Sequence, residues 1–291
     1  MIFGISSTIG AGIFAFTGLA SNYTGPSVCL SFLIAGIVAL LTGLVFAEMS
    51  GWVPFSGSTY SYVYTSLGEY PAWLVGWCQI LRCGLTGCAL ARAWAEYIIG
   101  LLTTVGVSNI PDWIHHLDLG NGVYASPLAS VFVVICHLIL LWGSKESLYF
   151  TNILTIAKLV FVFFIIIASI FYVNSENWYP FLKNGFNGVL TGSSIVFFGY
   201  LGFDSITVVA EESINPWRDI PWAVLCSTTF CGVVYILMSL LICGVASMEG
   251  LNAETAVAVV FTERGATWVA VIVFIGGFLG LSTAGYAPFL T

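Results

Sequence analysis

Charged side chains are scarce in this sequence. Seven Lys and Arg together with fourteen Asp and Glu make up 7% of the 291 residues, whereas about a quarter of an ordinary soluble domain is charged. Hydrophobic residues make up 59%. This composition excludes an ordinary soluble domain and indicates a polytopic membrane protein. The net charge of −7 identifies no basic partner or nucleic acid, because the acids lie mostly in loops and at expected helix ends.

Residues that usually carry enzyme chemistry are also few. The three His and eight Cys do not occur at metal-ligand spacings, and the cysteines fall largely in apolar segments, as small buried hydrophobes do. No His, Ser and Asp set is evident. The start of the chain lacks the basic region and cleavage site of a signal peptide. We therefore expect no enzyme active site, no metal and no cofactor.

Long apolar runs, separated by Gly, Pro and polar clusters, predict eight membrane helices. They span residues 2–20, 26–48, 70–102, 126–143, 150–173, 188–212, 222–246 and 266–290. The expected fold is all-α, a single polytopic transmembrane helical bundle over residues 1–291. Residues 1–173 would form a first set of five helices, and residues 187–291 would hold helices six to eight.

The sixth predicted helix is interrupted near its middle. Gly199 and Gly202 occur three residues apart in an apolar run, and the charged Asp204 follows. At 1.5 Å per residue, Gly199 lies roughly 16 Å along the helix, near the centre of a hydrocarbon core roughly 30 Å thick. Unwound backbone at that depth has to line a cavity. Carriers of small solutes hold their substrates at such breaks.

The first predicted helix contains a similar weak point. Gly10 and Gly12 occur within the stretch from Ser6 to Phe14, roughly 14 Å from the end of the helix. Equivalent breaks five helices apart predict an inverted repeat with a binding site at the interface of the repeats. The alternative is that these glycines only permit close packing of helices.

Six motifs in a fixed order carry a family resemblance. They are STIGAGIF (7–14), GPSVCLSFLIAG (25–36), VPFSGSTYSY (53–62), LARAWAEY (90–97), KESLYFTNI (145–153) and YLGFDSITVVAEESINPWRDIP (200–221). In these motifs the chain resembles the cationic amino acid transporter family of the amino acid, polyamine and organocation superfamily. The resemblance implies a five-plus-five inverted-repeat (LeuT-like) fold with discontinuous helices 1 and 6 and a cytoplasmic N-terminus. It also implies that the second repeat is incomplete in this chain.

The resemblance places an amino acid substrate on backbone groups at the two breaks. Its carboxylate would bind N–H groups, and its ammonium would bind carbonyl oxygens, so no charged side chain is required. The implied N–H groups belong to Ala11, Gly12 and Ile13, and the implied carbonyls to Thr8, Ile9, Phe198, Gly199 and Leu201.

Lys158 is the candidate for proton coupling. It lies roughly 12 Å into the fifth helix, too deep to reach the interface easily. Desolvation disfavours the charged form of a buried amine, so such a lysine can load and release a proton near neutral pH. In proton-coupled relatives a lysine at the matching position packs against the broken first helix. The alternative is a structural lysine that binds helix-end carbonyls.

Arg82 departs from the family pattern, which tends to have an acidic or neutral residue at this point. If it faces the cavity, its charge would repel a cationic substrate side chain; otherwise it turns away and pairs elsewhere. Arg92 and Glu96, four residues apart on one helix, are expected to form a structural pair. Asp204 could hold a cation, but it directly precedes the second half-helix, so we expect it to cap that helix.

A further group is implied at the inner end of the sixth helix. Glu211 and Glu212 would lie where the helix dipole disfavours acids, and Arg218 is the nearest basic partner in sequence. By resemblance these three residues would form an inner gate.

The sequence thus predicts a secondary active transporter of L-amino acids, cationic or neutral. Transport would be coupled to protons and would proceed by alternating access. The alternative is a truncated, non-transporting amino acid binder or sensor. The expected partners are the amino acid, protons and the lipid bilayer. No disulfide-linked heavy subunit is expected, because the loop at residues 103–126 contains no cysteine. The resemblance implies a multi-pass protein of the plasma membrane or of an endolysosomal or vacuolar membrane.

Overall fold

The computed structural model describes residues 2–53, 55, 57–107, 110–114, 116–118, 120, 124–142, 144–208, 213, 215–247 and 251–290. This part of the chain is almost entirely helical, which confirms the predicted all-α bundle. The α-helices are α1 (Ile2–Thr8), α2 (Ala11–Phe14), α3 (Phe16–Thr24), α4 (Val28–Trp52), α5 (Ser58–Leu67), α6 (Glu69–Val105), α7 (Pro127–Trp142), α8 (Ser144–Tyr172), α9 (Gly185–Phe197), α10 (Asp204–Val208), α11 (Pro216–Val245), α12 (Ala256–Glu263) and α13 (Thr267–Leu290).

Short 3-10 helices and one small sheet join these helices. The 3-10 helices are η1 (Gly25–Ser27), η2 (Asp112–Ile114), η3 (Ser175–Trp178) and η4 (Phe198–Tyr200), and strands β1 (Leu117–Asp118) and β2 (Tyr124–Ala125) pair antiparallel. All eight predicted ranges contain helix. The first is divided into α1, α2 and α3, and the sixth into α9, η4 and α10. Helices α5 and α12 were not predicted.

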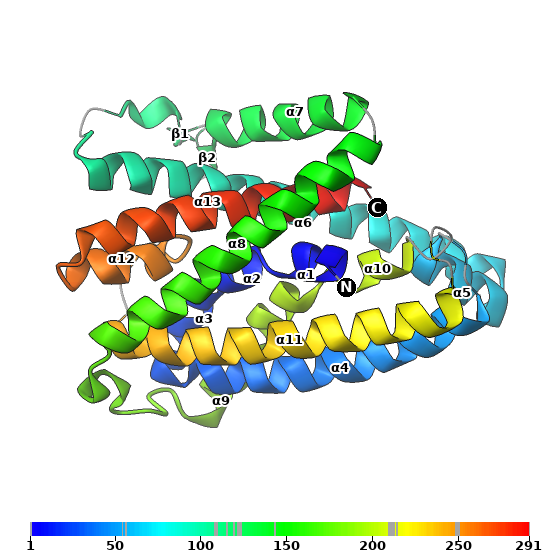
Figure 1. Ribbon diagram of the computed structural model, residues 1–291, viewed down its shortest axis with the longest axis horizontal. Helices are drawn as coiled ribbons and strands as arrows, with labels where there is room; N and C mark the ends of the chain where they lie inside the picture. Colours follow the sequence, from blue (N-terminus) through cyan, green and yellow to red (C-terminus); the bar gives the residue numbers. More distant parts are fainter. Residues whose placement is uncertain are drawn as a thin grey trace.

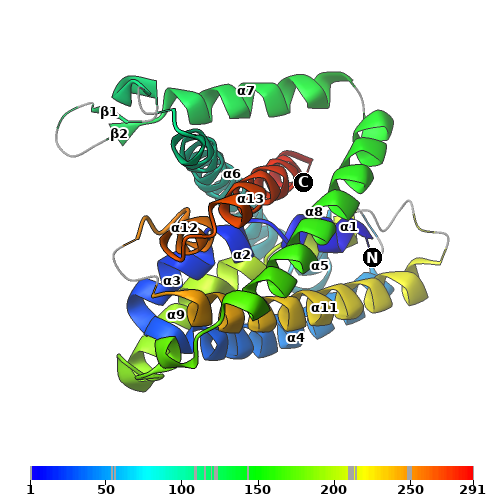
Figure 2. The ribbon, with the colours of Figure 1, turned by 60° about the vertical axis from the view of Figure 1, so that its left-hand side comes forward.

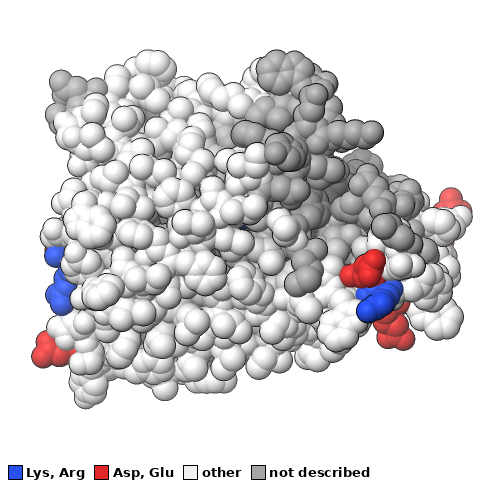
Figure 3. All heavy atoms as spheres, in the orientation of Figure 1, with Lys and Arg blue, Asp and Glu red and all other residues white. Residues whose placement is uncertain are grey.

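The helices have the length and composition of membrane spans. Within the described residues, six helical stretches are long and apolar enough to cross a membrane, and α7 contributes a shorter apolar stretch, Pro127–Leu138. On the face in Figure 3, the Lys, Arg, Asp and Glu atoms of the described residues lie toward the two ends of the long axis, and the described residues between them are uncharged. The chain is therefore a multi-pass integral membrane protein.

Two groups of long helices enclose the short broken pieces. On one side α11 packs along α4, and α9 packs against α4 and α3. On the other side α13 packs against both α6 and α8, with α7 beyond α6 (Figure 1). Helices α1, α2 and α10 lie in the middle of the molecule, as the rotated view in Figure 2 also shows for α1 and α2.

Small residues bring α4 and α11 together. Ala35, Ala39, Gly43 and Ala47 recur every four residues along α4, and all four are buried. A Cβ atom at Gly43 would already lie 3.4 Å from Val224 of α11. Helix association in membranes depends on such close approach, because lipid is as apolar as the helix surfaces. The α4–α11 pair thus forms a firm support beside the broken helices.

Candidate functional site

The first helix is broken where the sequence predicts it. Helix α1 ends at Thr8, and α2 begins at Ala11. A Cβ atom at Gly10 would lie 2.3 Å from the Cβ atom of Ala284 in α13, so only glycine permits this crossing. The N–H groups at the start of α2 have no carbonyl of their own helix to bind, as at any helix N-terminus.

The second break lies between η4 and α10. Leu201 is extended (φ −62°, ψ 136°), and Gly202 has a φ of +136°, which side-chain-bearing residues rarely adopt. A Cβ atom at Gly202 would also lie 2.7 Å from the backbone of Ser7. Ser7 Oγ donates a hydrogen bond to the Gly202 carbonyl at 2.8 Å. The unwound backbone of one helix is thus held directly against the other.

The two breaks touch each other at glycines. A Cβ atom at Gly199 would lie 2.5 Å from the Cα atom of Gly12, and a Cβ atom at Gly12 would lie 2.8 Å from the Gly199 carbonyl oxygen. Tyr235 of α11 joins them, because its hydroxyl lies 2.6 Å from the Thr8 carbonyl and 2.9 Å from the Gly199 carbonyl. Tyr235 is fully buried. The sequence analysis did not identify this residue, since a tyrosine in an apolar helix gives no signal of its partners.

A cavity of about 570 Å³ opens beside the paired breaks. Five of the predicted binding residues line it: Thr8, Gly12, Phe198, Gly199 and Leu201. The opposite wall is a strip of α6 that includes Leu81, Arg82, Leu85, Thr86 and Ala89. The volume is sufficient for a small organic molecule.

Two other predicted residues do not line the cavity, and two of the predicted carbonyls already accept a hydrogen bond. Ile9 and Ile13 are buried and are not among the cavity-lining residues, and the side chain of Ala11 lies outside the described part. The Ile9 carbonyl accepts a hydrogen bond from Lys158 at 2.8 Å, and the Phe198 carbonyl accepts one from the Leu201 N–H at 3.3 Å. Each carbonyl oxygen has two lone pairs, so such a group can still accept a second hydrogen bond.

Lys158 of α8 braces the first break. Its Nζ atom donates to the Ser6 carbonyl, to the Ile9 carbonyl at 2.8 Å and to Thr283 Oγ1 of α13 at 3.0 Å. The side chain is 0% exposed and is not part of the cavity wall. Ser6 Oγ lies 3.4 Å from the same Nζ atom. A protonated amine has three donors, and these acceptors are enough to engage all of them. These contacts link α8 and α13 to the backbone at the end of α1.

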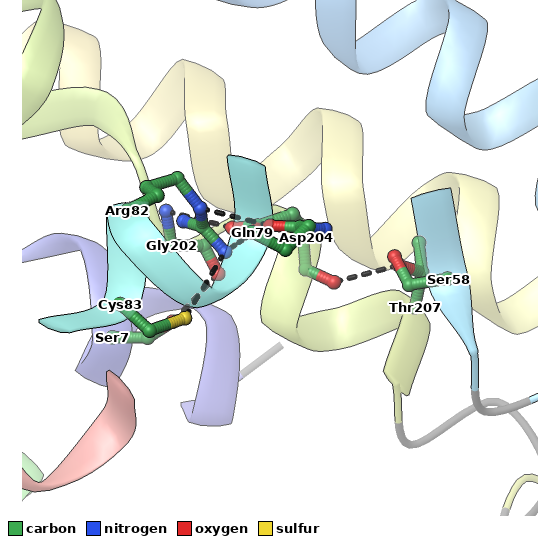
Figure 4. Close-up of polar contacts among 8 residues, drawn as sticks. All are labelled: Ser7, Ser58, Gln79, Arg82, Cys83, Gly202, Asp204 and Thr207. Carbon is green, nitrogen blue, oxygen red and sulfur yellow. Dashed lines mark hydrogen bonds and ion pairs between the residues drawn. The ribbon is translucent and has the colours of Figure 1, made fainter. Parts of the chain in front are cut away.

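Arg82 faces the cavity and is paired at the same time. One of its Nη atoms lies 2.6 Å from Asp204 Oδ2, and its Nε atom donates to Gln79 Oε1 at 2.9 Å (Figure 4). Asp204 Oδ1 accepts the N–H of Gly202 at 3.2 Å. The expected N-cap role of Asp204 is wrong, because Asp204 is already the first residue of α10 and its carboxylate turns back toward Gly202 and Arg82.

The other predicted charged groups lie elsewhere. Arg92 and Glu96 form no ion pair among the described side chains; instead Glu96 Oε2 accepts a hydrogen bond from Asn252 at 3.2 Å, so the expected pair is wrong. Glu211 and Glu212 lie outside the described residues. Arg218 is exposed in the first turn of α11.

Two facing broken helices beside one cavity, in a multi-pass helical bundle, are typical of membrane carriers that bind solutes at discontinuous helices. Comparison with known proteins gives the family. Residues 1–289 match the family described as amino acid permease, and the chain belongs to that family. Its members are transporters, not enzymes.

The similar proteins are named for several different substrates. The chain is 34% identical over 289 residues to the vacuolar cationic amino acid transporter 4 of Arabidopsis thaliana, covering 96% of this chain and 47% of that protein. It is 34% identical to the methylthioribose transporter and 33% identical to the branched-chain amino acid permease BcaP, both of Bacillus subtilis, covering 97% of this chain and 61% of each. The chain thus spans about half the length of the curated relatives it matches.

Proposed function

We propose that this chain carries the substrate site of a secondary active transporter for L-amino acids, coupled to protons and working by alternating access. The observation that supports this most directly is the contact of two broken helices at Gly12 and Gly199 beside a cavity of about 570 Å³. Membership of the amino acid permease family supports the same substrate class.

In this proposal the backbone binds the part common to all amino acids. The N–H groups of Ala11, Gly12 and Ile13 receive the carboxylate, since a helix start attracts anions. Carbonyls at the breaks, with Leu201 at the cavity wall, receive the ammonium. The substrate side chain then points toward α6, which forms the opposite wall.

Lys158 supplies the proton step. When protonated, it holds the Ser6 and Ile9 carbonyls and thereby fixes the end of α1. On loss of its proton the amine has one donor fewer and no charge, so its hold on these acceptors weakens. The backbone around the N–H groups of α2 is then free to shift, and bound amino acid is released.

The test uses the chain purified and reconstituted in proteoliposomes. Binding of radiolabelled amino acids and uptake driven by an inward proton gradient are measured for wild type, Lys158→Ala and Lys158→Arg. We expect both variants to lose gradient-driven uptake while retaining equilibrium binding, since arginine does not release its proton. The matched control is Lys183→Arg in the exposed turn before α9, which should transport as wild type does.

Gradient-driven uptake that persists in both Lys158 variants would refute the proton step. Saturable binding by wild type without any uptake would refute transport and identify a non-transporting binder. Absence of amino acid binding altogether would refute the proposed site.

A further inference from the structure

The charge in the cavity wall comes from α6. Of the described residues that line the cavity, Arg82 alone is charged. Its neighbours on the wall are mostly apolar, among them Phe16, Leu81, Leu85 and Phe198. An unpaired arginine here would give the cavity a strong preference for anions.

Asp204 neutralises that charge. The ion pair is direct, at 2.6 Å, and the two side chains are 28% and 13% exposed. Both ends are held in place by other contacts: Gln79 accepts a hydrogen bond from Arg82, and the Gly202 N–H donates to Asp204 (Figure 4). The pair therefore has a fixed geometry at the edge of the cavity, and its net charge is zero.

A neutral pair in an apolar wall has consequences for both signs of charge. A cationic side chain entering the cavity meets Arg82, which lines the wall, whereas Asp204 is not among the lining residues. An anionic side chain finds the charge of Arg82 already balanced by Asp204. Either charge would lose its water without acquiring a free partner. An uncharged, apolar side chain has no hydrated charge to lose, and it gains free energy when it packs against the apolar wall.

We infer that the Arg82–Asp204 pair is the charge-selectivity element of the cavity and that it restricts this site to amino acids with uncharged side chains. The inference rests on the proposed function and specifies its substrate class. It further requires that each partner, when freed from the other, select the opposite charge. Removing Arg82 exposes a carboxylate to cationic substrates, and removing the charge of Asp204 exposes a guanidinium to anionic ones.

The test is competition against bound radiolabelled leucine on the purified chain in lipid nanodiscs. The competitors are unlabelled leucine, arginine and glutamate, and the measured quantity is the ratio of their half-inhibitory concentrations. In wild type, arginine and glutamate should each compete about tenfold less well than leucine, or worse, as expected when a charge is desolvated without a partner. Leucine is the reference in every variant.

Each variant changes the charge of one or both side chains of the pair while keeping a similar side-chain shape. Arg82→Gln should improve arginine relative to leucine by about tenfold and leave glutamate excluded. Asp204→Asn, whose amide oxygen can still accept the Gly202 N–H, should improve glutamate by a similar factor of about ten. The double variant Arg82→Gln/Asp204→Asn again has a neutral cavity wall. Leucine, arginine and glutamate should therefore compete in the same order as in wild type. Arg92→Gln, a matched arginine on the exposed side of α6, should leave the ratios unchanged.

Each outcome decides the question. Wild-type ratios in both single variants, or a shift of both toward the same charge, would overturn the inference while leaving amino acid binding intact. A wild type that prefers arginine to leucine would also overturn it. If leucine, arginine and glutamate all fail to bind to wild type, the proposed function fails, and the inference fails with it. If a single variant does not fold, the double variant and the charge-swapped Arg82→Asp/Asp204→Arg still report whether a balanced pair keeps the neutral preference.

Discussion

Replacing Gly199 by Ala would test the contact between the two broken helices. The added Cβ atom would lie 2.5 Å from the Cα atom of Gly12, whereas carbon atoms in contact are normally about 3.5–4.0 Å apart. The two backbones therefore have to separate by about 1 Å or more. The neighbour is backbone rather than a flexible side chain, so it cannot turn aside.

The expected cost follows from this geometry. Forcing extra atoms into a packed core destabilises proteins by about 1–3 kcal/mol, and the displaced atoms here belong to the proposed site itself. We expect Gly199→Ala to lower the melting temperature of the detergent-purified protein and to weaken amino acid binding by about tenfold or more, since 1.4 kcal/mol corresponds to a factor of ten.

Gly232→Ala is the matched control. It lies within α11, where its Cβ atom would meet Tyr200 at an ordinary 3.6 Å. Alanine is also favoured over glycine inside a helix by roughly 1 kcal/mol. The control should melt at or above the wild-type temperature and bind normally. Wild-type melting and binding in Gly199→Ala would show that the glycine contact does not shape the site.

Three further predictions concern other parts of the molecule. Tyr235→Phe removes the hydroxyl donor that contacts two carbonyls at the breaks. Losing this buried donor should cost about 1–3 kcal/mol and lower the melting temperature, and unchanged melting would contradict the hydrogen bonds. Among the described residues Glu254 Oε2 is buried without a hydrogen-bond partner, and burial together with Glu96, opposed by Arg92, raises the pKa of this carboxyl. The folded chain then holds this proton more tightly than the unfolded chain, so this group's contribution to stability falls as the pH rises from about 4 through the raised pKa. Glu254→Gln should remove that fall and melt higher than wild type at pH 7; an equal pH dependence of melting in both proteins would contradict it. The absence of cysteine at residues 103–126 predicts that native gels run with and without reductant show the same species, and a partner released by reduction would refute this.

The breaks were predictable because they are local. Glycine pairs in apolar runs, placed about midway along a predicted helix, mark both positions, and the structure interrupts the helices at Ile9–Gly10 and at Leu201–Phe203. The long helices were predictable for the same reason, since a membrane imposes continuous apolar runs.

The pairings across the site were not predictable from one sequence. Arg82 and Asp204 lie on separate helices, and each alone allows several roles. The two alternatives considered for Arg82, facing the cavity or pairing elsewhere, turn out to be compatible in the structure. Helix α5 was missed because STYSYVYTSL is short and rich in polar and aromatic residues. Its contacts with α6 and the bond between Ser58 and Thr207 of α10 hold it in place.

The hydroxyl of Tyr235 has a consequence for motion. It contacts the Thr8 and Gly199 carbonyls from a continuous helix that is itself packed along α4. While both hydrogen bonds persist, the separation of these two carbonyls is fixed, whatever angle α3 or α10 adopts beyond the breaks. In the proposed transport cycle the two breaks would stay in contact at these two carbonyls, while α2, α3 and α10 beyond them would move.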